Sequence, residues 1–143
     1  MWDTIFASVN LLAMAAWAIL ILAPRKELLL TVVLYLGVGI LCLVYSVGLI
    51  SVLVGSEGSG LDFGSIEGVR AIFATDSGVT IGWTHYLAFD LFVGLWIARD
   101  ADAKKFSRWL QAPILLATLM AGPLGLFVWL AIRETRRAPR KAS

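Results

Sequence analysis

The chain has 143 residues, of which 59% are hydrophobic and 15% charged, and its mean hydropathy is +0.85. A soluble domain carries roughly a quarter charged residues, so this composition excludes a water-soluble globular domain and indicates an integral membrane protein with a single domain. The net charge of +2 is uninformative because the charges gather at the ends of apolar segments. The basic tail over residues 133–143 indicates contact with anionic lipid headgroups rather than with nucleic acid.

The first apolar segment covers about residues 4–22 and is followed by Pro24, Arg25 and Lys26. A secretory signal peptide is the alternative. No basic stretch precedes the segment, however, and the apolar run is too long, so we expect a transmembrane helix. Asn10 lies inside this span, where an asparagine usually forms a hydrogen bond between helices, with a ligand contact as the other interpretation.

The second segment runs from about residue 28 to 54 and ends at a Gly- and Ser-rich stretch over residues 55–60. It is longer than the ~20 residues that cross a bilayer, so we expect tilt or a projecting end. Tyr45 lies within it, either as an interfacial anchor or as a ligand contact. Cys42 is the single cysteine, which predicts a small hydrophobic residue and excludes a disulfide framework and a cysteine metal site.

Residues 62–74 are neither loop nor span. Apolar side chains recur here at helical spacing, with Asp62 or Ser65 available to cap the start and residues 75–78 available to turn the end. This pattern predicts a short amphipathic helix in the membrane interface. An ordinary connector outside the membrane is the alternative.

The third span, about residues 80–98, carries the only histidine, His85, and an aspartate at its midpoint, Asp90. A charged group inside a membrane helix is costly and usually faces a partner, a cavity or a substrate. At 100° per residue, His85 lies about 140° from Asp90, so the two cannot pair within the helix. The residues predicted to share the face of Asp90 include Trp83, Tyr86 and Gly94.

These residues suggest acid–base chemistry. Burial in hydrocarbon favours a protonated Asp90, and a position in the first helical turn favours a neutral His85 that can accept a proton. The alternative is structural: Asp90 bonds to Asn10 or to a tyrosine, and His85 lies at the wet interface. The charges that follow, Arg99, Asp100 and Asp102, are interpreted as an end-of-helix cluster.

The fourth segment covers about residues 110–132 and contains Gly122-Pro123 near its middle, where proline removes a backbone hydrogen bond and kinks a helix. Together the segments predict an all-α bundle of four transmembrane helices. Four spans place six Lys and Arg residues on each side, so the orientation is not resolved.

Several chemistries are excluded. A single histidine rules out bis-histidine haem and a multi-histidine metal site. No phosphate loop or dinucleotide motif is present. We therefore predict no metal and no cofactor.

The run GWTHYLAFDLFVG over residues 82–94 resembles the signature of the abscisic-acid-deficient-four-like family of small four-span membrane proteins. Residues 63–70 and 122–126 resemble the other landmarks of that family, in the same order and spacing. Plant members are needed to form neoxanthin, which requires opening the epoxide of violaxanthin into an allene. The resemblance therefore implies a carotenoid or terpenoid isomerase.

In that reaction an acid protonates the epoxide oxygen and a base removes a proton from the developing carbocation. The resemblance would make Asp90 the acid and His85 the base. The remaining positions expected to contact the lipid, two of them through cation–π contact with the carbocation, are Trp83, Tyr86, Gly94, Asn10, Tyr45 and Pro123.

No plastid transit peptide precedes the first span, so a bacterial member in the inner membrane is expected. Its expected partners are the lipid bilayer and an apolar lipid or carotenoid, with a homo-oligomer left open. The alternative function is a non-enzymatic membrane subunit that binds such a lipid or stabilises an enzyme complex.

Overall fold

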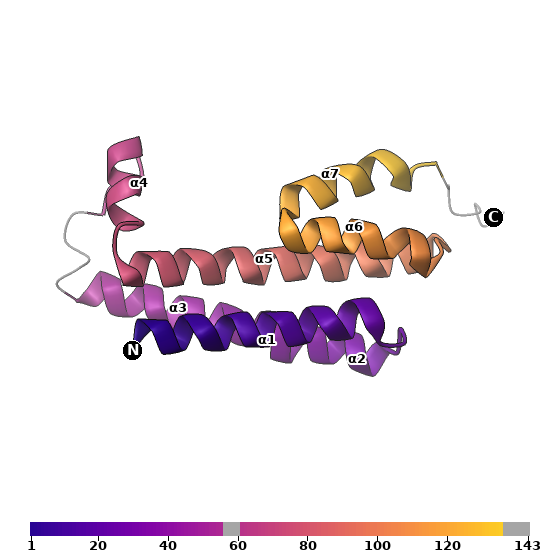
Figure 1. The fold of residues 1–143 in the computed structure, drawn as a ribbon, viewed down its shortest axis with the longest axis horizontal. Coiled ribbons are helices and arrows are strands. Elements are labelled where there is room, and N and C mark those ends of the chain that lie inside the picture. Colours follow the sequence, from indigo (N-terminus) through magenta and orange to yellow (C-terminus); the bar gives the residue numbers. More distant parts are fainter. Residues whose placement is uncertain (56–60, 136–143) are drawn as a thin grey trace, which may run out of the picture.

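The structure is a computed structural model that describes residues 1–55 and 61–135. All regular structure in these two ranges is helical (Figure 1). Three helices are long and apolar enough to cross a membrane, namely Trp2–Leu22, Glu27–Val54 and Asp76–Ala103. They contain the first three predicted spans.

The first long helix is α1 (Trp2–Leu22), and the second is built from α2 (Glu27–Val32), η1 (Val33–Gly39) and α3 (Ile40–Val54). The η1 segment has the wider turns of a π-helix, which often occur near functional sites. Gly37 lies within it, and a Cβ atom there would lie 3.0 Å from the Cβ atom of Ala16. The missing side chain therefore lets η1 pack closely on α1.

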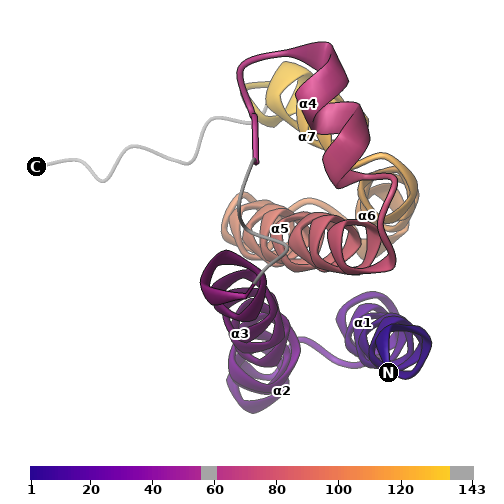
Figure 2. The same cartoon turned by 90° about the vertical axis from the view of Figure 1, so that its left-hand side faces the viewer.

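The central helix is α5 (Asp76–Ala103). Figure 2 shows it between α1 and α3 on one side and the two last helices on the other. Thr75 is the N-cap of α5, because its side chain accepts a hydrogen bond from the amide of Gly78. Residues 75–78 thus start the long helix and do not form the predicted terminal turn of the preceding one. At Gly94 a Cβ atom would collide with the ring of the fully buried Trp17, so this glycine fixes the distance between α1 and α5.

The predicted fourth span over residues 110–132 is not one helix. It consists of α6 (Arg108–Met120) and α7 (Gly122–Arg133), which pack against each other as a hairpin (Figure 1). The break is at Ala121, with φ −155° and ψ 81°. The helix α6 has 13 residues and α7 has 12, so they are about 20 Å and 18 Å long. Both are shorter than the hydrocarbon core of a bilayer, which is about 30 Å thick.

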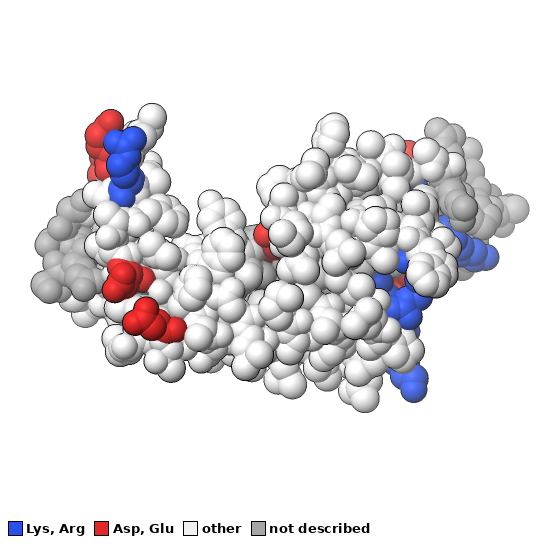
Figure 3. All heavy atoms as spheres, viewed as in Figure 1, with Lys and Arg blue, Asp and Glu red and all other residues white. Residues whose placement is uncertain are grey.

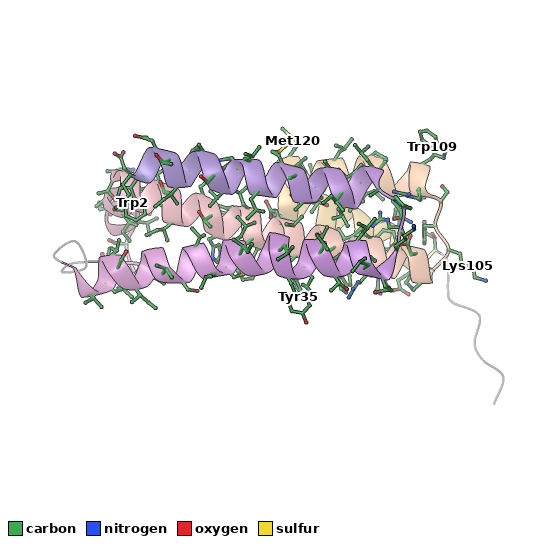
Figure 4. The ribbon with its side chains drawn as sticks, turned by 90° about the horizontal axis from the view of Figure 1, so that it is seen from below. Trp2, Tyr35, Lys105, Trp109 and Met120 are labelled. Carbon is green, nitrogen blue, oxygen red and sulfur yellow. The ribbon has the colours of Figure 1, made fainter. Side chains whose placement is uncertain are left out.

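The turn of this hairpin lies near the middle of the long axis of the bundle, where Figure 4 labels Met120. Pro123 lies in the first turn of α7, where its missing amide has no hydrogen bond to lose. The proline predicted to kink one helix therefore starts a new helix. The chain reverses at this point and returns toward the end from which α6 began.

The short helix α4 (Ile66–Ile72) lies within the predicted range of 62–74. Ser65 caps it by accepting a hydrogen bond from the amide of Gly68. A Cβ atom at Gly82 would collide with Phe73, so the chain after α4 packs directly on α5. A location in the membrane interface stays a prediction.

The two ends of the bundle differ in charge (Figure 3). We call the end that holds the α1–α2 loop and the α5–α6 connection the basic end, and the other the acidic end. Of the eight Lys and Arg residues in the described ranges, seven lie at the basic end: Arg25, Lys26, Arg99, Lys104, Lys105, Arg108 and Arg133. The acidic end holds the eighth, Arg70, with Asp3, Asp62, Glu67 and Asp76.

Candidate functional site

A pocket of about 390 Å³ lies where α3, α4 and the start of α5 meet. Its walls are mainly apolar, with Leu49, Phe63 and Phe73 among them. A few polar side chains interrupt this lining: Tyr45, Thr75, Ser77, His85 and Tyr86. An apolar cavity with a small number of placed polar groups is typical of a site for a small apolar molecule.

His85 lies at the wall of this pocket among aromatic rings. Its ring centroid is 5.3 Å from that of Tyr45 on α3, 4.6 Å from that of Phe89 and 6.1 Å from that of Tyr86. The imidazole therefore combines a proton-accepting nitrogen with neighbours that suit an apolar ligand. The sequence placed His85 and Tyr45 on different spans without indicating that they meet.

A second depression of about 430 Å³ lies further along the same side of α5. It is lined by η1 and α3 from one side and by α5 from the other: Leu34, Tyr35, Val38, Gly39, Cys42, Ala88, Phe89 and Phe92. We call the line along which η1 and α3 pack on α5 the seam. Tyr45 and His85 line the first pocket and Cys42 and Phe89 the second, so the two follow one another along the seam, within about one helical turn. From Gly78 to Phe92 this stretch of α5 is about 21 Å long.

Asp90 faces the α6–α7 hairpin. The backbone amide of Gly122 donates a hydrogen bond to its carboxylate, so Asp90 caps the first turn of α7. A Cβ atom at Gly122 would collide with this carboxylate, so only glycine allows so close an approach. The structural interpretation of Asp90 thus has a specific partner, which is neither Asn10 nor a tyrosine.

Asp90 and His85 lie on different faces of α5, as their spacing predicts. Tyr86 lies between these two faces and lines the pocket. It is also one helical turn from Asp90, a spacing at which side chains are neighbours. Among the pocket residues on α5, Tyr86 is therefore the one whose position comes nearest to the face of Asp90.

Trp83 and Asn10 form a different group, which ties α1 to α5. The indole N–H of Trp83 donates to Asn10 Oδ1 at 3.0 Å, and the indole stacks on Phe6. The Asn10 amide also donates to the carbonyl of Phe6 at 2.7 Å. Neither residue is among those lining the pocket around His85.

The predicted site residues therefore fall into separate groups. His85, Tyr45 and Tyr86 line the pocket, whereas Asp90 and Pro123 lie at the hairpin turn. The other three, Trp83, Asn10 and Gly94, lie at the contact between α1 and α5. Trp17 covers Gly94, which leaves this glycine a packing role.

Asp100 has a role that its sequence context did not reveal. Arg133 Nε donates to Asp100 Oδ2 at 2.8 Å and Arg133 Nη2 to Oδ1 at 3.2 Å, while the Trp129 indole donates to Oδ2 at 3.0 Å. This two-point contact holds the end of α7 against α5. No signal in the sequence links Asp100 to a residue 33 positions away.

The start of α6 is held at the same end. Arg108 donates to the carbonyl oxygens of Ile21 and Ala23 at 2.9 and 2.7 Å. Arg25 donates to Gln111 Oε1 at 3.1 Å, with its Nε 3.7 Å from Asp102. Burial lowers the pKa of Arg25, and Asp102 opposes that effect.

The rim of the pocket at α4 depends on Asp62. Its carboxylate accepts hydrogen bonds from the Ser65 hydroxyl and from the amide of Gly64, at 2.7 Å for the latter. These bonds hold the pKa of Asp62 below its usual range, with the Ser65 hydroxyl as the larger cause.

In the described ranges no three His, Cys, Asp or Glu residues converge to hold a metal ion.

Comparison with curated proteins and with solved structures gives no match. Comparison with family models does. Residues 4–129 match the family described as ABA DEFICIENT 4-like, a range that extends from α1 into α7. The chain therefore belongs to the ABA DEFICIENT 4-like family.

Proposed function

We propose that this protein is an intramembrane isomerase of a carotenoid or related terpenoid lipid, with His85 as the base. One observation carries the proposal: the only histidine of the chain lines an otherwise mainly apolar pocket, beside Tyr45 and Phe89. A histidine imidazole can accept a proton and return it, which is the task of a general base. Membership of the family supports the choice of substrate class.

The shape of the site supports an elongated ligand. A volume of about 390 Å³ falls within the ~300–1,000 Å³ of typical small-molecule sites and would hold a ring at the end of such a lipid. The second depression would receive the adjoining part of its chain along the seam. His85 would then lie against the junction between the ring and the chain of the lipid. An epoxide-opening isomerisation removes a proton from a carbon of the lipid at this junction.

The proposed reaction is balanced by one proton in and one proton out. A proton that originates on Asp90 would reach the epoxide oxygen, the carbon–oxygen bond would open to a carbocation, and His85 would remove a proton from carbon. Asp90 and His85 lie on different faces of α5, so Tyr86, which lies between them, would relay the proton from Asp90 to the substrate. The rings of Tyr86 and Phe89 would stabilise the positive charge.

The second candidate is a lipid-binding subunit without catalysis. The hydrogen bond from Gly122 to Asp90 favours it, because it gives the intramembrane carboxylate a structural task. Under this alternative the pocket binds the same class of lipid, and His85 and Asp90 matter only for folding and retention.

The first experiment is extraction and mass spectrometry of the lipid that copurifies with the protein from its native membrane. A bound carotenoid or terpenoid supports the proposal and names the substrate to assay. Bulk phospholipid alone would contradict a bound carotenoid or terpenoid and would favour a subunit that stabilises an enzyme complex.

Substitutions then separate the candidates. For the enzyme, His85→Gln and Asp90→Asn should each lower turnover of an epoxy-carotenoid by about 10²-fold or more, with unchanged lipid retention and a loss of stability below about 1 kcal/mol. Asp3→Asn, at an exposed aspartate in the first turn of α1 that lines neither depression, is the matched control and should retain activity. Unchanged product formation by both variants would contradict the acid–base roles.

A further inference from the structure

The α6–α7 hairpin changes how the chain relates to the two sides of a membrane. The start of α6 is tied to the end of α1 through Arg108, and the end of α7 is tied to α5 through Asp100 and Arg133. Both contacts lie at the basic end (Figure 1). The hairpin therefore enters and leaves at one end, which leaves three crossings in place of four.

Three crossings also remove the ambiguity in the charge count. In a four-span chain the Lys and Arg residues divide six to six between the sides. In the structure, seven of the eight in the described ranges lie at the basic end, and Arg70 alone lies at the other (Figure 3). An excess of Lys and Arg marks the cytoplasmic side of membrane proteins, because translocation of these residues is disfavoured.

The pocket around His85 lies toward the opposite end. Its walls include α4 and the first residues of α5, from Thr75 onward. His85 is nine residues from Asp76, which is about 14 Å along α5. The pocket thus occupies the half of the bundle that the hairpin does not reach, and α4 forms its rim.

We infer that the pocket opens to the non-cytoplasmic leaflet and takes its lipid from there. The leaflet assignment stands on the charge distribution and the hairpin, while the identity of the lipid rests on the proposed function. The hairpin occupies the cytoplasmic half, so an elongated ligand would lie with its reacting ring in the non-cytoplasmic half and its chain pointing along the seam toward the cytoplasm.

Single-cysteine variants in full-length protein test the assignment. Cys42, the only native cysteine, is first replaced by alanine. One cysteine is then introduced at an exposed residue: Glu67→Cys in α4, Ser107→Cys before α6, or Thr135→Cys after α7. Intact bacterial cells expressing each variant are treated with a membrane-impermeant maleimide, before and after permeabilisation.

We expect Glu67→Cys to react in intact cells, and Ser107→Cys and Thr135→Cys to react only after permeabilisation. Reaction of Thr135→Cys together with Glu67→Cys would restore four spans and overturn the inference. Reaction of Ser107→Cys in intact cells, with Glu67→Cys protected, would place the pocket in the cytoplasmic leaflet and overturn it as well.

A fourth variant, Ala71→Cys, separates the leaflet from the ligand, because Ala71 is exposed and lines the pocket. It should react in intact cells, and preloading the membrane with an epoxy-carotenoid should slow its reaction several-fold without affecting Glu67→Cys. Reaction from outside with no protection would support the leaflet assignment and contradict the proposed ligand. Reaction only after permeabilisation would overturn the leaflet assignment.

Discussion

At the scale of the residue, Asp90 shows how one side chain can serve both fold and chemistry. Its carboxylate caps α7 through the amide of Gly122, at a position where a bilayer supplies no water to replace the bond. An asparagine retains an acceptor oxygen of the same shape. Alanine leaves the amide of Gly122 without that acceptor.

We therefore expect Asp90→Ala to destabilise the protein by about 1–3 kcal/mol and Asp90→Asn to do so by under about 1 kcal/mol. The measurement is unfolding by SDS in mixed micelles. Asp3→Ala, at an exposed position in the first turn of α1, is the control. Equal stability of Asp90→Ala and the parent protein would refute the capping role.

Gly94 offers a second test at this scale. A Cβ atom there would collide with the ring of Trp17, so Gly94→Ala should separate α1 from α5 and cost about 1–3 kcal/mol in the same assay. Gly39→Ala is the matched control, because its Cβ atom would meet only the carbonyl of Leu34 at 3.6 Å. If the two variants were equally stable, the close α1–α5 contact would be wrong.

Helical spacing predicted the relative directions of side chains on α5 but not what each of them meets. Trp83, Asp90 and Gly94 were placed on one face, and the structure gives them Asn10, Gly122 and Trp17 as neighbours. Periodicity within one helix contains no information on which other helix covers each part of a face. The assignment of Trp83 and Gly94 to a ligand site stays a prediction, although neither residue lines the pocket around His85.

At the scale of the element, hydropathy located the three long helices and failed at the fourth segment. The mainly apolar segment of 23 residues over 110–132 has the same composition whether it crosses as one helix or folds back. The hairpin depends on contacts with distant residues, Asp90 at its turn and Asp100 at its end. Gly122-Pro123 indicated where the helix is interrupted. The reversal of the chain depends on the contact of Gly122 with Asp90 on α5, which the sequence did not indicate.

The helix α4 carries a prediction on pH. Hydrogen bonds from Ser65 and Gly64 lower the pKa of Asp62 in the folded protein. A carboxylate with a lowered pKa contributes stability above its unfolded value, near 3.9, and this contribution is lost as the pH falls through the folded value.

A fluorophore at Ala71→Cys, in the Cys42→Ala background, should therefore report loosening of α4 as the pH falls from about 6 to 3. Asp62→Asn should show the loosened signal already at neutral pH and little change on acidification. A pH response that persists in Asp62→Asn would assign the titration to another group.

At the scale of the whole molecule, the seam is the feature that unites the two depressions. Cys42 lies in the second one, beyond the level of His85 and Tyr45. We expect Cys42→Trp to fill the second depression and weaken binding of a full-length carotenoid at least tenfold, while a short molecule bearing only the ring still binds. Cys42→Ser is the control. Equal binding of both ligands by Cys42→Trp would show that the chain does not follow the seam.

The class of the molecule, an all-helical chain with spans apolar enough for a membrane, followed from composition and segment length. The motif over residues 82–94 predicted the family, and the family match over residues 4–129 confirms it. The pocket could not be derived in the same way, because Tyr45 and His85 are 40 positions apart and meet only through the packing of α3 on α5.

The π-helical segment η1 has a consequence for how that packing is specified. Relative to an uninterrupted α-helix, a π turn acts as an inserted residue, which rotates everything after it by about 100°. Tyr45 follows η1 and faces His85 with that rotation included. Deleting one residue from Val33–Gly39 would turn Tyr45 away and present another face of α3 to α5, although the composition of the span would hardly change. The geometry of the seam is thus set by the number of residues in this stretch, as well as by their kind.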